Sequence, residues 1–377
     1  MGLADVWRRV CYDLRMLFLG NLLPEVWFAD THGLLLMAIV VFAMFCVIKG
    51  ADWLVEGAAG IAKRLGMPEV IIGATIVSLG TTTPEAAVSV LAAWSGDAGL
   101  ALGNGVGSII ADTGLIFGVG CLMCALPADR FVLSRQGWVQ FGAGLLLALL
   151  CVGAYMIMGD EAVLGRWVGV LLVGLLVGYL VISVKWSRMH PHGEPRLVSE
   201  EETVEARGYE ERSKEDRGVG VLLGMGLAGL VLVIFSGDGL VQAVTVLAEK
   251  AGIPQVVIAS TLVAFGTSLP ELVVGVTAIR KGHAELLVGN VIGADILNVL
   301  FVIGVSAMAA PLGIVDMKAN VPEIFLYMHL PVMVGMLVLM RIFIAGSVKT
   351  GAFKRWMGVP LVAGYVFFVG LQYWLSA

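Results

Sequence analysis

The chain has 377 residues, of which 59% are hydrophobic and 14% charged, and its mean hydropathy is +0.93. These values lie well outside the range of a water-soluble domain. The net charge of −5 is small and scattered, which argues against nucleic acid or another polyanion as a partner. Composition therefore predicts a protein that resides in a lipid bilayer.

The first 32 residues precede the first long apolar run. Arg8, Arg9 and Arg15 leave only a short apolar stretch before Pro24, so the segment does not read as a secretory signal. A short amphipathic helix of this kind is expected to dip its apolar face into the headgroup boundary while its arginines stay in water. We therefore predict an N-terminal interfacial segment over 1–32.

Ten long apolar runs follow, and each is close to the roughly 20 residues that a helical span needs. They are continuous, whereas barrel strands alternate apolar and polar residues, so helices are favoured. The runs cover residues 33–57, 68–94, 99–126, 136–158, 164–186, 218–247, 254–279, 285–311, 321–345 and 354–375. The sequence thus predicts an all-α membrane protein with ten transmembrane helices.

The chain also repeats itself with a shift of 186 residues. Residues 73–118 aligned without gaps against 259–304 give 17 identities in 46 positions, mostly at Gly, Pro, Thr, Glu and Asn. The shift aligns Glu85, in the second predicted span, with Glu271, in the seventh. An odd number of crossings separates the two, so the copies enter the membrane from opposite sides. We expect two inverted five-helix repeats, an architecture that recurs in secondary transporters.

The repeats are predicted to occupy 33–186 and 218–377, joined by a polar linker over 187–217. The linker is rich in Lys and Arg, and most other basic connections fall on its side of the membrane. The positive-inside rule then makes the linker cytoplasmic and both termini external in the cytoplasmic membrane, although the arginines of the N-terminal segment count against this orientation.

Acidic residues inside predicted spans are the strongest functional signal. A carboxylate in mid-membrane costs about 2.5–3.5 kcal/mol on insertion scales, so four of them would cost about 10 kcal/mol if unpaired. The residues are Glu85, Asp112, Glu271 and Asp295. The neighbouring spans offer few bases, so a bound cation is the economical explanation.

Proline precedes each glutamate, at Pro84 and Pro270, and should kink the span and free carbonyl oxygens. Oxygen atoms are the ligands of hard cations, and calcium takes six to eight of them. An acid and an amide, Asp112 and Asn298, each follow their glutamate by 27 residues. The two repeats therefore contribute near-symmetric sets of oxygen ligands.

The motifs Gly-Thr-Thr-Thr-Pro-Glu at 80–85 and Gly-Thr-Ser-Leu-Pro-Glu at 266–271 resemble the α-repeats of the cation/calcium exchanger superfamily, most closely its prokaryotic sodium/calcium antiporters. The resemblance covers most of the chain from residue 33 on. It implies a central calcium site of Glu85, Asp112, Glu271 and Asn298, assisted by Thr81 and Thr267. It also implies two flanking sodium sites, one made by Thr81, Thr82, Ser108, Glu85 and the Ser78 carbonyl, the other by Thr267, Ser268, Glu271 and the Ala264 carbonyl.

This sequence departs from the family pattern at two neighbouring positions. Ala294 stands where the second repeat usually has serine, which removes a hydroxyl ligand, and Asp295 stands where asparagine is common. We hypothesise that Asp295 compensates for Ala294, either as a ligand or as a proton-titrating group that alters the coupling ion. The alternative is an acid that only packs between helices.

The resulting prediction is a secondary-active antiporter that exchanges sodium for calcium by alternating access and exports calcium. One alternative keeps the fold and couples calcium to protons or potassium; a more distant alternative is a passive cation channel. No phosphate loop, histidine metal pair or nucleophile with a base partner is present, so we predict neither an enzyme nor a bound cofactor. The expected partners are calcium, sodium and the lipid bilayer, and the sequence carries no signal for an oligomeric state.

Overall fold

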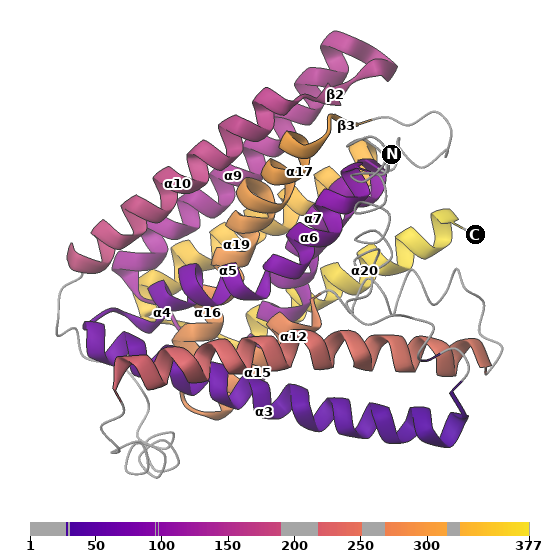
Figure 1. The fold of residues 1–377 in the computed structure, drawn as a ribbon. Helices are drawn as coiled ribbons and strands as arrows, with labels where there is room; N and C mark the ends of the chain where they lie inside the picture. Colours follow the sequence, from indigo (N-terminus) through magenta and orange to yellow (C-terminus); the bar gives the residue numbers. More distant parts are fainter. Residues whose placement is uncertain are drawn as a thin grey trace, which may run out of the picture.

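The structure, a computed structural model, describes residues 28, 31–94, 96, 98–189, 218–250, 268–314 and 325–376. Nearly all of the predicted interfacial segment and of the linker, and parts of two predicted spans, lie outside these ranges. The described chain is mostly helical (Figure 1). Every predicted span that the structure describes, in full or in part, coincides with helical segments, as the continuous apolar runs predicted.

The first half begins with one long helix and continues with helices that are broken at several points. Its elements are α3 (Gly33–Leu65), α4 (Glu69–Ile72), the π-helical turn η1 (Gly73–Val77), α5 (Ser78–Thr81), α6 (Thr83–Trp94), α7 (Ala98–Ala111), the π-helical turn η2 (Asp112–Ile116), α8 (Phe117–Met123), β1 (Leu126–Pro127), α9 (Arg130–Met158), η3 (Gly159–Glu161), β2 (Val163–Leu164) and α10 (Arg166–Met189).

The described part of the second half follows the same plan. Its elements are α12 (Val219–Lys250), α15 (Leu269–Arg280), α16 (Ala284–Leu297), the π-helical turn η6 (Asn298–Ile303), α17 (Gly304–Ala309), β3 (Leu312–Gly313), the π-helical turn η7 (Phe325–His329), α19 (Leu330–Thr350), β4 (Ala352–Phe353), η8 (Arg355–Met357) and α20 (Gly358–Ser376).

The element bounds repeat with the same shift as the sequence. Adding 186 to the bounds of α6 and α7, 83–94 and 98–111, gives 269–280 and 284–297, the bounds of α15 and α16. The short strands, which the sequence did not predict, pair crosswise: β1 with β4 and β2 with β3, both antiparallel. Each small sheet therefore takes one strand from each half of the chain.

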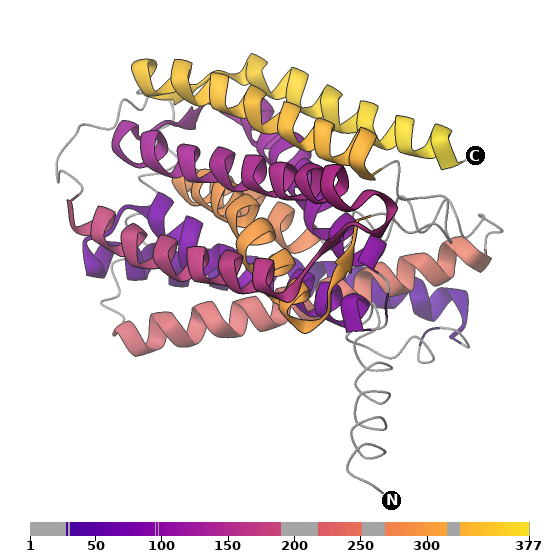
Figure 2. The same cartoon turned by 90° about the horizontal axis from the view of Figure 1, so that it is seen from above.

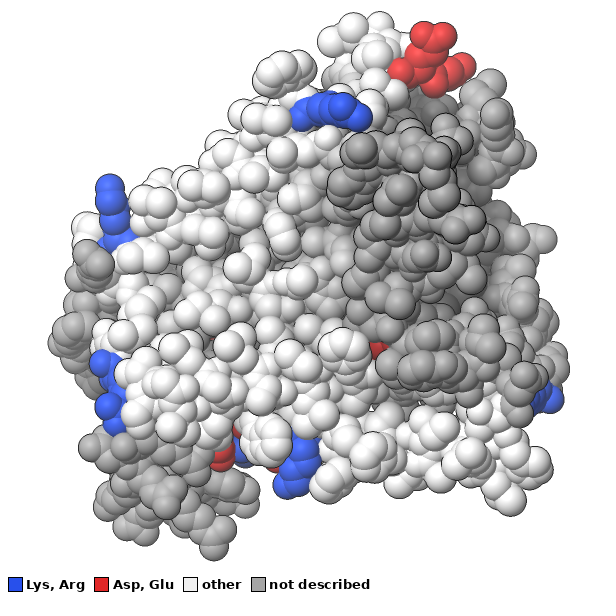
Figure 3. Space-filling view, in the orientation of Figure 1, with Lys and Arg blue, Asp and Glu red and all other residues white. Residues whose placement is uncertain are grey.

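Seven helices in the described ranges are long and apolar enough to cross a bilayer, and up to eight if the bent segment 69–94 is one span. Two of the ten predicted spans, 254–279 and 321–345, begin on residues outside those ranges. The exact count of ten therefore stays a prediction, while a multi-helix membrane protein is supported. The face drawn in Figure 3 agrees, because charged side chains of the described residues lie mostly at its rim and leave a broad uncharged surface between.

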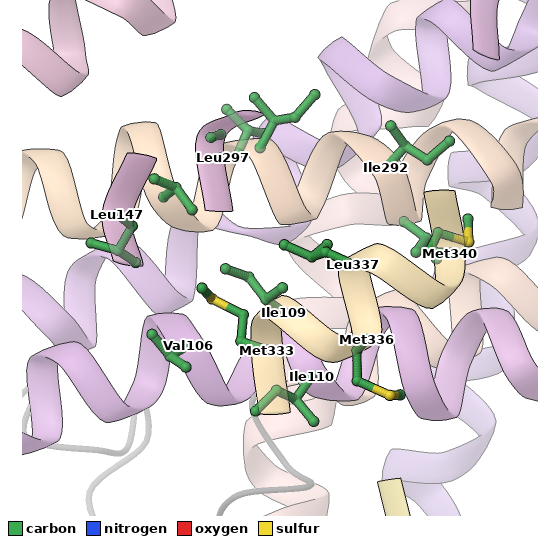
Figure 4. Packing of buried hydrophobic residues seen from close by; sticks show 14 of the residues in the cluster. Val106, Ile109, Ile110, Leu147, Ile292, Leu297, Met333, Met336, Leu337 and Met340 are labelled. Carbon is green, nitrogen blue, oxygen red and sulfur yellow. The ribbon is translucent and has the colours of Figure 1, made fainter. Parts of the chain in front are cut away.

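The core is centred on α16, which packs against α4, η1, α9 and α15. Figure 4 shows Ile292 and Leu297 of this helix near apolar side chains of α7, α9 and α19, such as Ile109 and Leu337. Glycines permit some of the closest contacts. A Cβ atom on Gly73 would lie 2.6 Å from the carbonyl oxygen of Leu286, so the two backbones nearly touch.

The long helices α3 and α12 lie side by side along one edge of the molecule, and Figure 2 shows α20 along the opposite edge. Glycines again set the approach: a Cβ atom on Gly50 would lie 2.8 Å from the carbonyl oxygen of Gly229, and one on Gly229 would lie 2.5 Å from the oxygen of Gly50. Small residues at such crossings are typical of helix pairs in membranes.

Candidate cation-binding site

The two glutamates occupy equivalent places in the fold. Glu85 is the third residue of α6 and Glu271 the third of α15, and a proline precedes each within the first helical turn. Proline is tolerated there because the first turn has no intrahelical partner for its N–H. The positive end of the helix dipole also favours a carboxylate at this position. The expected kink is present in the first half, where α5 and α6 meet at Thr82 with a bend of 43°.

Asp112 and Asn298 are also equivalent, since they begin the π-helical turns η2 and η6. Such turns occur frequently at functional sites. The amide nitrogen of Asn298 donates to Oδ2 of Asp112 at 3.3 Å, and both side chains are buried. The structure therefore brings the predicted acid and amide of the two repeats into direct contact.

The four intramembrane acids are close enough for their charges to interact. Glu85 interacts with Glu271 and with Asp112, and Asp112 also interacts with Glu271 and Asp295. None of the four forms a salt bridge with a described Lys, Arg or His. A group of buried, ionised acids without basic partners is unfavourable unless a bound cation or protons neutralise the charge.

Five buried carboxylate and amide oxygens at this place have no hydrogen-bond partner in the part of the chain that the structure describes. They are Glu85 Oε2, Asp112 Oδ1, Glu271 Oε2, Asp295 Oδ1 and Asn298 Oδ1. Their side chains are at most 2% exposed. An unsatisfied buried acceptor costs about 1–3 kcal/mol, and a charged one costs more. All five are acceptors, which is the pattern that a cation would complete.

Hydroxyl groups of the first repeat surround the same acids. Thr81 and Thr82 are fully buried and close enough to interact with the Glu271 carboxylate. Thr81 Oγ1 also lies 3.4 Å from Oδ1 of Asn290. The Ser78 carbonyl, predicted to be a free ligand, already accepts the N–H of Thr82 at 2.8 Å. The threonine hydroxyls are thus better placed than this carbonyl to act as neutral ligands in this conformation.

The remaining predicted ligands fall into two groups. Ser108 and Ser268 are buried, at 5% and 4% exposure, in α7 and immediately before α15. Thr267 and Ala264 lie outside the described residues. Within the described ranges, no three Asp, Glu, His or Cys side chains converge closely enough to hold a metal ion by themselves. Neutral oxygens must therefore supply part of any coordination shell.

Asp295 has two partners that the sequence did not point to. Its Oδ2 accepts hydrogen bonds from the hydroxyl of Thr113 and from Nε2 of Gln140, both at 2.6 Å. Gln140 lies in α9, 155 residues away along the chain. The available signal was a pair of amides, Gln136 and Gln140, four residues apart in a long apolar run, and an amide alone does not identify its partner.

Comparisons with known proteins agree with this geometry. The chain matches the family described as sodium/calcium exchanger protein over residues 35–185 and 221–374. It is 30% identical over 356 residues to the sodium/calcium exchanger MaX1 of Methanosarcina acetivorans, covering 89% of this chain and 98% of that protein. It is 31% identical over 344 residues to the inner membrane protein YrbG of Escherichia coli, covering 91% and 98%.

A solved structure of the sodium-calcium exchanger NCX_Mj, soaked with sodium and strontium, is similar in fold. The TM-score is 0.70 at 25% sequence identity, and the match covers 89% of this chain and 98% of that one. The likeness therefore extends over nearly the whole length of both proteins.

Proposed function

Because the chain belongs to the sodium/calcium exchanger family, we propose that it is an antiporter that exchanges sodium for calcium across the cytoplasmic membrane and exports calcium. Its relatives are transporters, and the chain is not an enzyme. The observation that carries the proposal is a cluster of five buried acceptor oxygens on five helical segments from both halves. Among the described residues, these oxygens have neither hydrogen-bond donors nor basic partners. A transported cation would satisfy them.

In this proposal calcium binds between the two halves, at Glu85, Asp112, Glu271 and Asn298, with Thr81 and Thr267 as neutral ligands. Sodium binds beside it, at positions that share these carboxylates. The ligands of one position are Thr81, Thr82, Ser108, Glu85 and the Ser78 carbonyl. Those of the other are Thr267, Ser268, Glu271 and the Ala264 carbonyl. Because both ions need the same acids, they compete, and the carboxylates are neutralised by either one.

The transport cycle that we propose is alternating access between two inverted five-helix repeats. The helices α3 and α12 contact each other closely and contribute none of the proposed ligands. They are the natural candidates to move against the helices that carry the acids. Crossing with empty, charged sites is unfavourable, so exchange is obligatory. We place the linker over 187–217 in the cytoplasm and both termini outside, which lets inward sodium flow drive calcium out.

Calcium-45 uptake into proteoliposomes tests this proposal. Vesicles loaded with sodium and diluted into sodium-free buffer should accumulate calcium, whereas vesicles loaded with potassium, with acid or with no gradient should not. Glu85→Gln should lower the initial rate about 100-fold, because a lost charged ligand to a buried cation is worth on the order of 3 kcal/mol. The matched control is Glu161→Gln, the same chemical change at an exposed position in η3, which should behave like the parent.

Each alternative has its own outcome in the same assay. Uptake driven by internal acid or potassium instead of sodium would identify a proton- or potassium-coupled exchanger. Uptake that persists with no internal counter-ion gradient would identify a passive channel and overturn the antiporter. We favour a carrier, since ion channels with acidic rings are generally built around one axis, whereas these acids come from two halves of one chain.

A further inference from the structure

Asp295, Thr113 and Gln140 form a buried polar triad beside the proposed calcium site. They come from α16, η2 and α9, and Asp295 accepts hydrogen bonds from the other two. Asp295 is 2% exposed and Gln140 3%, and Thr113 is fully buried. Three polar side chains are therefore brought together inside the bundle. Burying polar groups is costly unless they are paired, and such groups inside membrane spans are commonly functional.

The pseudo-symmetric positions of Asp295 and Thr113 show that the fold does not require polar residues there. Subtracting 186 from 295 gives Ile109, and adding 186 to 113 gives Val299. Both counterparts are buried apolar residues. Figure 4 shows Ile109 among methionine and leucine side chains of α19. Apolar residues fill these pseudo-symmetric positions, so the polar triad, which takes residues from both halves, is an addition to the fold.

The hydrogen bonds of Asp295 are distributed unevenly over its two oxygens. Oδ2 accepts both donors, while Oδ1 has no partner among the described residues. Oδ1 of Asp112 and Oδ1 of Asn298 also have no hydrogen-bond partner among the described residues. The amide nitrogen of Asn298 donates to the other oxygen of Asp112, Oδ2. Asp112 and Asp295 are close enough for their charges to interact. Two carboxylates and one amide thus each keep one oxygen free within one buried region.

We propose that Asp112 and Asp295 hold an additional monovalent cation, with Oδ1 of Asn298 as a third oxygen. This position shares Asp112 and Asn298 with the proposed calcium site and adds Asp295 to them. The inference rests on the proposed function in that the ion would be part of the exchange cycle. It goes further by assigning a ligand, Asp295, that has no counterpart in the first half.

A monovalent ion fits this position better than calcium. Calcium takes six to eight oxygen ligands. Here Oδ2 of Asp295 is already occupied by two donors, and residue 294 is alanine, so it offers no hydroxyl. Thr113 and Gln140 do not contact the ion; they are positioning residues, whose donors fix the carboxylate so that Oδ1 remains free.

The direct test is sodium binding to the purified full-length protein. Ligands that bind the folded state raise the melting temperature with ligand concentration. Melting curves should be recorded in detergent over a sodium chloride series, with N-methylglucamine chloride holding ionic strength constant. Asp295→Asn keeps the size and one hydrogen-bonding oxygen of the side chain but removes its charge. It should reduce the number of sodium ions bound by about one, read from the slope of stabilisation against log sodium.

Two further variants test whether Asp295 is a sodium ligand or an acid that only packs between helices. Gln140→Leu removes one donor but keeps the charge of Asp295, so it should shift the sodium curve to higher concentration without lowering its slope. Asp160→Asn, the same chemical change at an exposed position, should leave the curve unchanged. A slope for Asp295→Asn equal to that of the parent overturns the proposal, even if the melting temperature in the absence of sodium has fallen.

Transport measurements can test the additional site at Asp295 separately from the proposed sodium/calcium antiport. In proteoliposomes, the reversal potential of exchange gives the sodium-to-calcium ratio, which should fall by about one sodium in Asp295→Asn. An unchanged ratio with intact exchange overturns the additional site and leaves the antiporter standing. If the parent shows no sodium-driven calcium uptake, the antiporter fails, and the melting experiment still decides whether Asp295 binds sodium.

Discussion

The helices α16 and α12, both from the second half of the chain, occupy opposite kinds of environment. Along the most apolar stretch of the span that contains α16, 94% of the residues are buried; along α12 the figure is 17%. α16 contacts helices from both halves and carries Asp295, next to Asn298, whereas α12 packs mainly on α3. Asp295 therefore sits on the part of the fold that is least free to shift, and α15, which carries Glu271, packs against it.

This difference gives the proposed cycle a physical basis. A helix that touches protein on nearly every side cannot translate without losing contacts over its whole surface, because close-packed interiors do not deform continuously. A helix pair that faces lipid over most of its surface loses few protein contacts when it moves, because lipid remains in contact with its outer face. We expect substitutions at α16 to act on stability and substitutions between α3 and α12 to act on transport.

The largest effect is expected from Gly289→Ala in α16. A Cβ atom there would overlap the backbone carbonyl of Val70, and backbone cannot rotate away as a side chain can. Overpacking of this kind costs about 3 kcal/mol, the upper end of the usual range. We expect a clear fall in melting temperature and in the yield of monodisperse protein. The control is Gly142→Ala, at an exposed position on α9. Equal melting temperatures for the two variants would contradict the view that α16 is the close-packed, fixed centre of the fold.

The sequence predicted the centre of this fold better than its surroundings. The repeat alone placed Glu85 and Glu271 at equivalent positions, and the structure brings Asp112 and Asn298 into contact as expected for equivalent residues of two halves. These predictions succeeded because two similar motifs, far apart in the sequence, are expected to take equivalent positions in the two halves of the fold. The ligand roles of these residues, and the full count of ten spans, stay predictions.

Other features depended on contacts that no local pattern encodes. The partner of Asp295 in α9 is Gln140. Gln136 and Gln140 are four residues apart in an apolar run, which marks a polar helix face, but only the tertiary structure joins Gln140 to Asp295. Pro84 predicted a kink and freed carbonyls; the bend is present, but the Ser78 carbonyl is held by Thr82 in a continued helical turn. The π-helical turn at Asp112 likewise depends on packing, because helix propensity does not distinguish it from an α-helix.

An intermediate effect is expected from Gly229→Ala, between α12 and α3. Its Cβ atom would lie 2.5 Å from the carbonyl oxygen of Gly50, but α12 can move outward into lipid to relieve the overlap. The cost in stability should therefore be about 1 kcal/mol, the lower end for overpacking. The exchange rate should fall about tenfold, equivalent to about 1.4 kcal/mol in the barrier. Gly224→Ala, exposed on the same helix, is the control. Unchanged transport in Gly229→Ala would show that the close α3–α12 contact has no part in the cycle.

The smallest effect is expected at the ionic contact between α3 and the turn that joins α15 to α16. The Lys281 ammonium lies 3.3 Å from Oδ1 of Asp52 and 3.3 Å from Oε1 of Glu56, and all three side chains are partly exposed. Exposed ion pairs contribute about 0–1 kcal/mol, so Lys281→Met should leave the melting temperature nearly unchanged. The contact nevertheless ties a proposed moving helix to the fixed centre. Releasing it should shift the apparent affinity for calcium by about threefold, measured as the KM of uptake, and less so at high salt.

Lys49 provides a matched control for that experiment. Its ammonium lies 3.7 Å from Oδ2 of Asp52, but both residues belong to α3, so this pair does not connect two elements. Lys49→Met removes the same charge beside the same acid and should leave the KM of uptake unchanged. If both variants shift the KM equally, the effect arises from the charge environment of Asp52. A shift in Lys281→Met alone would mean that the equilibrium between the two access states depends on where α3 is attached to the centre, and that α16 serves as the fixed reference for the motion.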